Sequence, residues 1–116
     1  MNSMQQATLL RIFIGESDQH DGRPLFEAIV LKARGQHLAG ATVLRGPMGY
    51  GHSSRLHTAS VLRLSEDLPI VVEIVDEDDK IAAFLPTLEA MMGGGLITME
   101  TVRVLRYSAG QGAEGR

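Results

Sequence analysis

The stretch "LPIVVEIVDEDDKIAAFLPTLEAMMGGG", residues 68–95, contains a strand and a helix in succession and decides how the rest of the chain is interpreted. Residues 68–76 are dense in β-branched side chains, which favour strands. Their apolar side chains occur on both faces of the predicted strand, because side chains alternate with a period of two. One face carries Ile70, Val72 and Ile74, and the other carries Val71, Glu73 and Val75. Such a strand is expected to lie inside a sheet.

The second part of the stretch, residues 76–92, is predicted to be a helix. Acidic residues crowd its start, where the helix dipole stabilises negative charge. An apolar stripe at helical spacing would face the sheet; it consists of Ile81, Phe84, Leu85, Leu88 and Met92. Pro86 lies inside the helix, where a proline costs about 3 kcal/mol, so we expect a kink or a tightened turn. The glycines at 93–95 are expected to end the helix.

The remaining elements follow from the same two periodicities. In chain order they are a strand over residues 7–14, a loop over 15–22, a helix over 24–35 that stops at Gly35, a strand over 40–46, and a last strand over 96–107 interrupted near 99–101. The order strand, helix, strand, strand, helix, strand predicts an α+β fold, the ferredoxin-like βαββαβ sandwich. Its antiparallel sheet would carry two helices on one face, with the first and third strands as parallel neighbours at the centre.

The chain is expected to be a single domain over residues 1–116, with an ordered core over 7–107 and a flexible tail over 108–116. The sheet face away from the helices would carry Leu9, Phe13, Val71 and Val75. An exposed apolar patch of this kind is unusual in a monomer, so we expect a closed homo-oligomer. Arg11 and Glu73 would lie on the same face of adjacent strands and form a cross-strand pair.

The composition excludes several classes of function. A net charge of -3 argues against a nucleic-acid-binding protein. The chain has no cysteine, so disulfides, thiolate metal sites and cysteine nucleophiles are excluded. It has no apolar run long enough for a membrane span, and its first residues lack the pattern of a signal peptide. We therefore expect a cytoplasmic protein that is not inserted in the membrane.

The segment from residue 45 to 64, "RGPMGYGHSSRLHTASVLRL", is too long for a hairpin turn and rich in chemistry-bearing residues. His52 and His57 are five residues apart, a spacing without a preferred geometry, and a metal site needs three or four converging ligands. The segment lacks the G-x-S-x-G pattern of a serine hydrolase. We therefore predict no catalytic residue and no metal ligand. Two alternatives stay open: a metal site made by these histidines with the acidic residues near Asp76, as in the trimeric CutA proteins, and a small enzyme using the histidines.

The sequence "GATVLRGPMGYG" of residues 40–51 resembles the strand and loop start of the PII signalling proteins, where a Gly-aromatic-Gly lies at the base of the T-loop. From residue 10 to 107 the chain is similar to the PII-like family known as domain of unknown function 190, DUF190. The resemblance implies a ferredoxin-like fold and a homotrimer whose open sheet faces meet around a threefold axis. It also implies that a small anionic effector, such as an adenine nucleotide, binds in clefts between subunits. A T-loop-like segment over 46–62 would then act on a transporter or an enzyme.

Carried over by position, the resemblance implies ligand-binding residues in three places. They are Gly49, Tyr50, Gly51, His52, Ser53 and Arg55 at the T-loop base; Gly93, Gly94 and Gly95 before the last strand; and Arg103 and Arg106 on that strand. The chain departs from the PII pattern at several of these positions. It has no lysine in "GGGLITMET", and it has His52-Ser53 where PII has Arg-Gln. It also has no tyrosine between Tyr50 and Tyr107, so regulation by tyrosine uridylylation is not expected, and the effector itself remains unknown.

Overall fold

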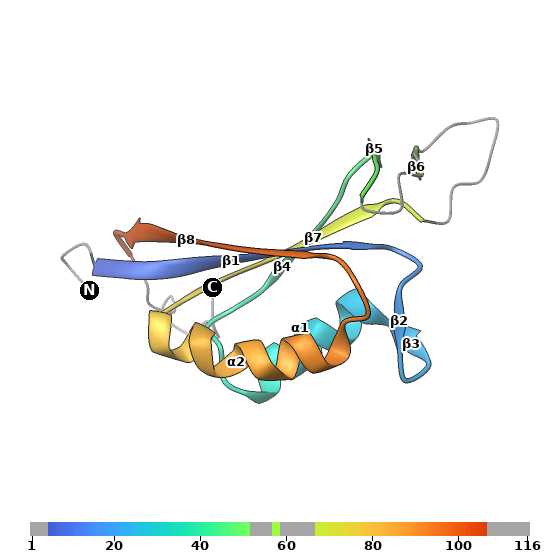
Figure 1. Cartoon of the computed structure of the whole chain (residues 1–116). Coiled ribbons are helices and arrows are strands. Elements are labelled where there is room, and N and C mark those ends of the chain that lie inside the picture. The colour runs from blue at the N-terminus through green and yellow to red at the C-terminus, as the bar shows by residue number, and fades with distance from the viewer. Residues whose placement is uncertain (1–4, 52–56, 59–66, 107–116) are drawn as a thin grey trace, which may run out of the picture.

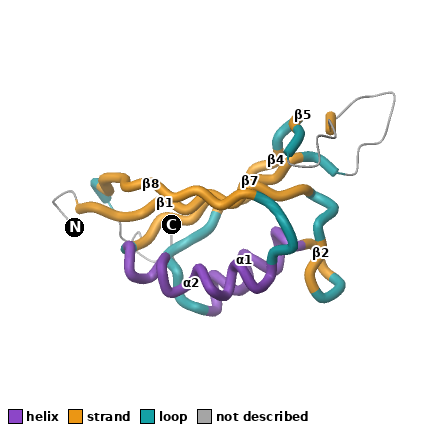
Figure 2. The backbone as a smooth tube through the Cα atoms, viewed as in Figure 1, coloured by secondary structure: helices purple, strands orange, loops and turns teal. Residues whose placement is uncertain are grey.

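The computed structural model describes residues 5–51, 57–58 and 67–106 and consists of a sheet covered by helices on one face (Figure 1). The sheet has four strands in the order β4-β7-β1-β8. Their bounds are Gln5–Gly15 for β1, Thr42–Arg45 for β4, Pro69–Asp76 for β7 and Leu96–Val104 for β8. The helices are α1, Leu25–Gly35, and α2, Asp78–Met91. The tube in Figure 2 shows both helices below the sheet, so the predicted α+β architecture is confirmed.

The direction of the central strands corrects one prediction. β1 and β7 are neighbours as expected, but they pair in antiparallel orientation, with Leu10 opposite Ile74 and Arg11 opposite Glu73. β4 pairs antiparallel with β7, so β4 runs parallel to β1 without touching it. The crossover through α1 therefore joins two parallel strands, and β7 lies between them in the opposite direction. The parallel strands are therefore β1 and β4, which α1 connects, and not β1 and β7, which are hydrogen-bonded neighbours.

The core lies between the sheet and the helices, and it is built from the alternation seen in the sequence. On β1 and β7 the buried side chains on the helix face are Leu10, Ile12, Ile14, Ile70, Val72 and Ile74. The helices contribute Leu25, Ala28, Ile29, Ala33, Ile81, Phe84, Leu88 and Met91. The predicted stripe of α2 is thus confirmed at Ile81, Phe84 and Leu88. Met91 takes the buried place predicted for Met92, while Leu85 and Met92 pack at its edge.

α2 runs through Pro86 without interruption. Pro86 is exposed, on the side of the helix away from the buried Phe84 and Leu88. Its missing N–H would have bonded the carbonyl of the exposed Ala82, which water can reach on that side. The kink at Pro86 stays a prediction, and the end of the helix before Gly93 is confirmed.

Two short hairpins and an unbroken last strand differ from the expectations. β8 is continuous because Met99 pairs with Leu10 and Thr101 with Thr8, so the predicted interruption is wrong.

Residues 15–22 were expected to be a plain loop, but β2, Gln19–His20, pairs with β3, Arg23–Pro24. The Asp21-Gly22 turn between them has φ angles of 51° and 81°, typical of a type I′ hairpin. The second hairpin joins β5, Met48–Gly49, to β6, His57–Thr58.

No helix among the described residues is both long enough and apolar enough to cross a membrane.

Candidate functional site

Most of the glycines singled out in the sequence gather at one end of the sheet, which we call the glycine end. β1 and β4 end here, and β7 and β8 begin here, as shown by the pairs Gly15–Pro69, Arg45–Ile70 and Phe13–Leu96. The glycine end consists of Gly15, Gly46, Gly49, Gly93, Gly94 and Gly95. Glycine permits close approach of the backbone to other groups, which makes this end the natural place to look for a ligand site.

Gly46 and Gly49 lie against the ring of Pro69, the first residue of β7. A Cβ atom at either glycine would be 3.0 Å from Cγ of Pro69, which is tighter than ordinary contact. The amide of Gly46 also donates to the carbonyl oxygen of Pro69 at 2.8 Å. The chain leaving β4 is therefore wrapped around the start of β7, and this wrapping sets the direction in which β5 departs.

The predicted ligand residues Gly49, Tyr50 and Gly51 come next along the chain, at the end of β5 and just after it. Tyr50 is 71% exposed, and a Cβ atom at Gly51 would meet no atom of the described residues within 4 Å, so neither is packed against the described part of the chain. Gly49 pairs with His57, which holds the two ends of the intervening segment together. The predicted residues His52, Ser53 and Arg55 lie outside the described residues.

Gly95 occupies the opposite edge of the glycine end, at the start of β8. Its φ of 114° suits glycine, and a Cβ atom there would lie 2.8 Å from the carbonyl oxygen of Phe13. Among the described residues, Gly93 and Gly94 have no such neighbours within 4 Å, so the described part of the chain leaves their backbone open. Three strand spacings separate β4 from β8, about 14 Å at about 4.8 Å each. Gly49 and Gly93 therefore share an end of the sheet but lie at opposite edges.

The loop after β1 is already satisfied by carboxylates of the chain itself. The amide of Gly15 donates to Asp18 Oδ2 at 3.0 Å, and the amide of Ser17 donates to Asp67 Oδ1 at 2.9 Å. Arg45 pairs with Glu16, with Nη2 and Oε2 2.5 Å apart. This part of the glycine end is therefore neutralised internally, and a ligand anion would have to displace a carboxylate to use it.

Arg103 and Arg106 are far from the glycine end. Arg103 pairs with Gln6 at the opposite end of the sheet, seven residues along β8 from Leu96, or about 23 Å at about 3.3 Å per residue. Both arginines are exposed. One chain thus does not bring the predicted glycines and arginines together, and a site that uses both must draw them from different subunits.

The sheet face away from the helices, here called the open face, carries the predicted apolar residues. Phe13 is 36% exposed. Two residues lie on the same face because of their strand partners: Leu44, opposite Val71, is 49% exposed, and Leu96, opposite Phe13, is 55% exposed. Leu9 also lies on this face but is buried. The open face is thus mainly apolar and only partly covered within one chain.

Arg11 forms the centre of an ion-pair cluster on the open face. Its Nε lies 2.9 Å from Glu73 Oε2, which confirms the predicted pair, and its Nη1 lies 2.8 Å from Glu100 Oε2. The hydrogen bond with Glu73 is the main cause that raises the pKa of Arg11. Glu100 was missed because its position depends on the register of β8, in which Glu100 lies opposite Leu9 and diagonal to Arg11.

Asp76, considered as a metal ligand, has a structural role. It is buried, its Oδ2 accepts from the amide of Ala39 at 2.9 Å, and its Oδ1 accepts from the amide of Glu77 at 2.7 Å. Over the described ranges, no three histidine, aspartate or glutamate residues form a group that could hold a metal ion. His52 lies outside these ranges, so the metal alternative stays untested.

Comparison with known proteins extends these observations. The profile of the DUF190 family, described as Uncharacterized ACR, COG1993, matches residues 7–104. A UPF0166 protein of Aquifex aeolicus is 39% identical over 97 residues, covering 84% of this chain and 91% of the relative. A UPF0166 protein of Methanocaldococcus jannaschii is 32% identical over 104 residues, covering 89% and 95%.

Two solved structures have a similar fold. CPII, a nitrogen regulatory PII-like protein from Thiomonas intermedia bound to ADP, AMP and bicarbonate, aligns with a TM-score of 0.64 at 14% identity, covering 91% of this chain and 94% of CPII. A PII-like signalling protein from Thermus thermophilus aligns with a TM-score of 0.65 at 18% identity, covering 89% and 93%. At these identities the likeness concerns the fold.

Proposed function

Because the chain belongs to the DUF190 family, we propose that it is a non-enzymatic PII-like regulatory protein. It binds a small anionic effector in clefts between the subunits of a homotrimer and acts on a partner protein through the segment over residues 46–62. The observation that carries the proposal is the fold, shared over nearly the whole chain with a protein that binds ADP, AMP and bicarbonate. Adenine nucleotides and bicarbonate are therefore the first effectors to test.

The open face supports the trimer. Phe13, Leu44 and Leu96 present apolar side chains to solvent in the isolated chain, and a second subunit would remove them from water. The Arg11 cluster is satisfied within the chain by Glu73 and Glu100, so burying this face would not strand an unpaired cation.

The separation between the glycine end and Arg103 supports a site built between subunits. Within one chain Arg103 lies at the far end of β8 from Gly94, whereas a neighbouring subunit would bring its own arginine to the cleft. Backbone amides at the open glycines and a guanidinium from the neighbour form a suitable donor set for a phosphate or a carboxylate.

Regulation would follow from the placement of β5 and β6. These strands hold the ends of the segment next to Tyr50 and Gly51, so a ligand bound there changes the population of segment conformations. A partner that recognises only the ligand-bound conformation would then respond to the effector.

Subunit mixing tests the proposal. One variant, Gly51→Trp, blocks the T-loop side of the cleft at a position with open space, and a second, Arg103→Glu, reverses the charge on the β8 side. Each variant alone should lose binding of ADP, AMP or bicarbonate in titration calorimetry. Co-expressed mixed trimers should regain it, because one cleft per mixed trimer then has two unaltered sides.

Light scattering provides the control for assembly in the wild type and both variants. A monomeric wild type at micromolar concentration would overturn the trimer. Loss of binding in both variants without recovery in mixed oligomers would overturn the site between subunits, and no binding of any of the three anions by the wild type would overturn their assignment as effectors.

A further inference from the structure

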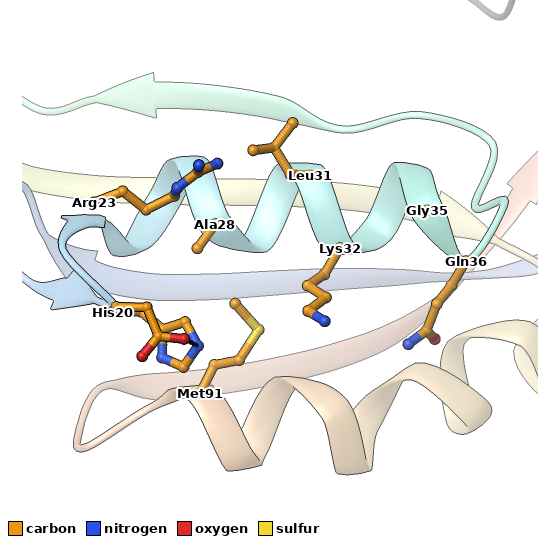
Figure 3. A pocket seen from close by; sticks show the side chains of 9 residues that line it. His20, Arg23, Ala28, Leu31, Lys32, Gly35, Gln36 and Met91 are labelled. Atoms are coloured by element: carbon orange, nitrogen blue, oxygen red, sulfur yellow. Dashed lines mark ion pairs between the residues drawn. The ribbon is translucent and has the colours of Figure 1, made fainter.

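A groove lies on the helix layer, on the opposite side of the molecule from the open face (Figure 3). It runs between α1 and the end of α2 and is bounded by the β2–β3 hairpin. Its volume is about 650 Å³, within the range of pockets that hold small molecules. Of the described residues, none of those assigned to the T-loop base or to β8 lines it.

The floor of the groove is apolar and one wall is held in place by a hydrogen bond. Ala28 and Met91 line the floor, and both are buried. Gln36 Nε2 donates to Thr87 Oγ1 at 2.9 Å, which ties the end of α1 to α2. This bond limits how far the two helices can move apart or together at that position.

The acid–base side chains that line the groove are mostly of the basic type. His20, Arg23 and Lys32 line it, with Asp21 as the acidic lining residue. Asp21 Oδ2 lies 3.4 Å from His20 Nε2, and Arg23 lies 3.8 Å from Glu27, one turn along the chain. These acidic groups are thus directed to His20 and Arg23.

Lys32 is the basic group left over. Within the described part of the chain, its ammonium group has no carboxylate at ion-pair distance. Figure 3 shows Lys32 and Gln36 projecting from α1 toward α2, while Met91 projects from α2 into the same gap beside His20. In the described part of the chain, this unpaired cation next to an apolar floor favours a ligand with one anionic group and a small apolar body.

We infer that this groove binds a small organic anion, a carboxylate or a phosphate monoester. Its charged group contacts Lys32, and its apolar body lies over Ala28 and Met91. The site is independent of the effector site proposed above, because it requires neither a second subunit nor the segment over residues 46–62. Failure of one site in experiment therefore leaves the other unaffected.

NMR titration of isotope-labelled full-length protein tests the inference. The probes are benzoate and phenyl phosphate as organic anions, benzamide as the uncharged analogue, and inorganic phosphate as the anion without an apolar body. Both organic anions should shift the amide signals of Ala28, Lys32, Gln36 and Met91, and should bind more tightly than either control probe. The relative affinities of benzoate and phenyl phosphate would distinguish a carboxylate from a phosphate ligand.

The matched variants are Lys32→Gln and Lys80→Gln, both on exposed helix positions, with Lys80 at the start of α2 and outside the groove. Loss of Lys32 should weaken binding of the organic anions about tenfold, the effect of losing one charge-assisted contact, while Lys80→Gln leaves it unchanged. Equal binding of benzamide, equal effects of the two variants, or shifts confined to other regions would overturn the inference.

Discussion

The two faces of the sheet are built from similar residues but have different surroundings. β1 alone supplies Leu10, Ile12 and Ile14 to one face and Leu9, Arg11 and Phe13 to the other. On the helix face these residues are buried by α1 and α2. On the open face Phe13 stays partly exposed, and an ion-pair cluster lies among the apolar side chains.

The difference teaches that apolar content by itself does not locate the core. Within one chain α1 and α2 cover the helix face, so its apolar side chains are removed from water and stabilise the fold. The open face has the apolar residues of an interior, but no described helix or strand packs over it, which is characteristic of a surface that meets another subunit.

The largest expected effect would come from the helix face. Phe84→Ala should lower the free energy of unfolding by about 3–5 kcal/mol, because the fully buried ring leaves a cavity. Denaturant unfolding followed by circular dichroism measures this loss. Phe13→Ala on the open face is the matched control, and under conditions where the protein is monomeric it should cost clearly less. Equal losses in the two variants would remove the distinction between the faces.

A smaller effect on stability, but a specific one on assembly, is expected at Leu44. Leu44 pairs with Val71 on the open face, so Leu44→Glu would place a charge in the proposed interface and weaken assembly at least about tenfold. Light scattering over a concentration series measures the effect. Leu31→Glu is the control, because Leu31 is similarly exposed, at 45%, but lies on α1. If Leu31→Glu dissociates the protein and Leu44→Glu does not, the interface lies on the helix side.

The smallest expected effect concerns Arg11. Arg11→Gln should lower the stability of the monomer only slightly, because ion pairs near a solvated surface contribute little. The difference from wild type should shrink further at about 1 M salt, where the screening length falls to about 3 Å. Thermal unfolding at low and high salt measures both. A large loss that is insensitive to salt would mean that Arg11 acts through packing instead of charge.

The features that were predicted correctly from the sequence depend mainly on residues that are close together along the chain. The alternation at 70–75 and the helical stripe through Phe84 identified the elements and the helix face correctly. The pair of Arg11 with Glu73 followed from the expected strand neighbours, and because both residues lie near the middle of their strands the prediction did not depend on strand direction. Glu100 could not be found in the same way, because the register of β8 is a property of pairing between distant segments.

The same limit applies to the candidate site. The resemblance to PII identified glycines that the structure places at one end of the sheet. It could not show that Gly49 and Gly93 lie at opposite edges, or that Arg103 lies at the far end. Distances of this kind depend on strand order and direction. The Asp21-Gly22 hairpin is a different case, since the dipeptide itself was a sufficient signal.

The contact of Gly46 and Gly49 with Pro69 has a practical consequence for engineering. Since Gly49 pairs with His57, any sequence placed between them starts and ends at neighbouring points that are anchored to the sheet. Lengthening such a connection costs only about 0.6 kcal/mol per doubling of its length. A binding peptide inserted between Arg55 and His57, beyond the residues predicted to bind the effector, would thus leave the sheet and its core intact.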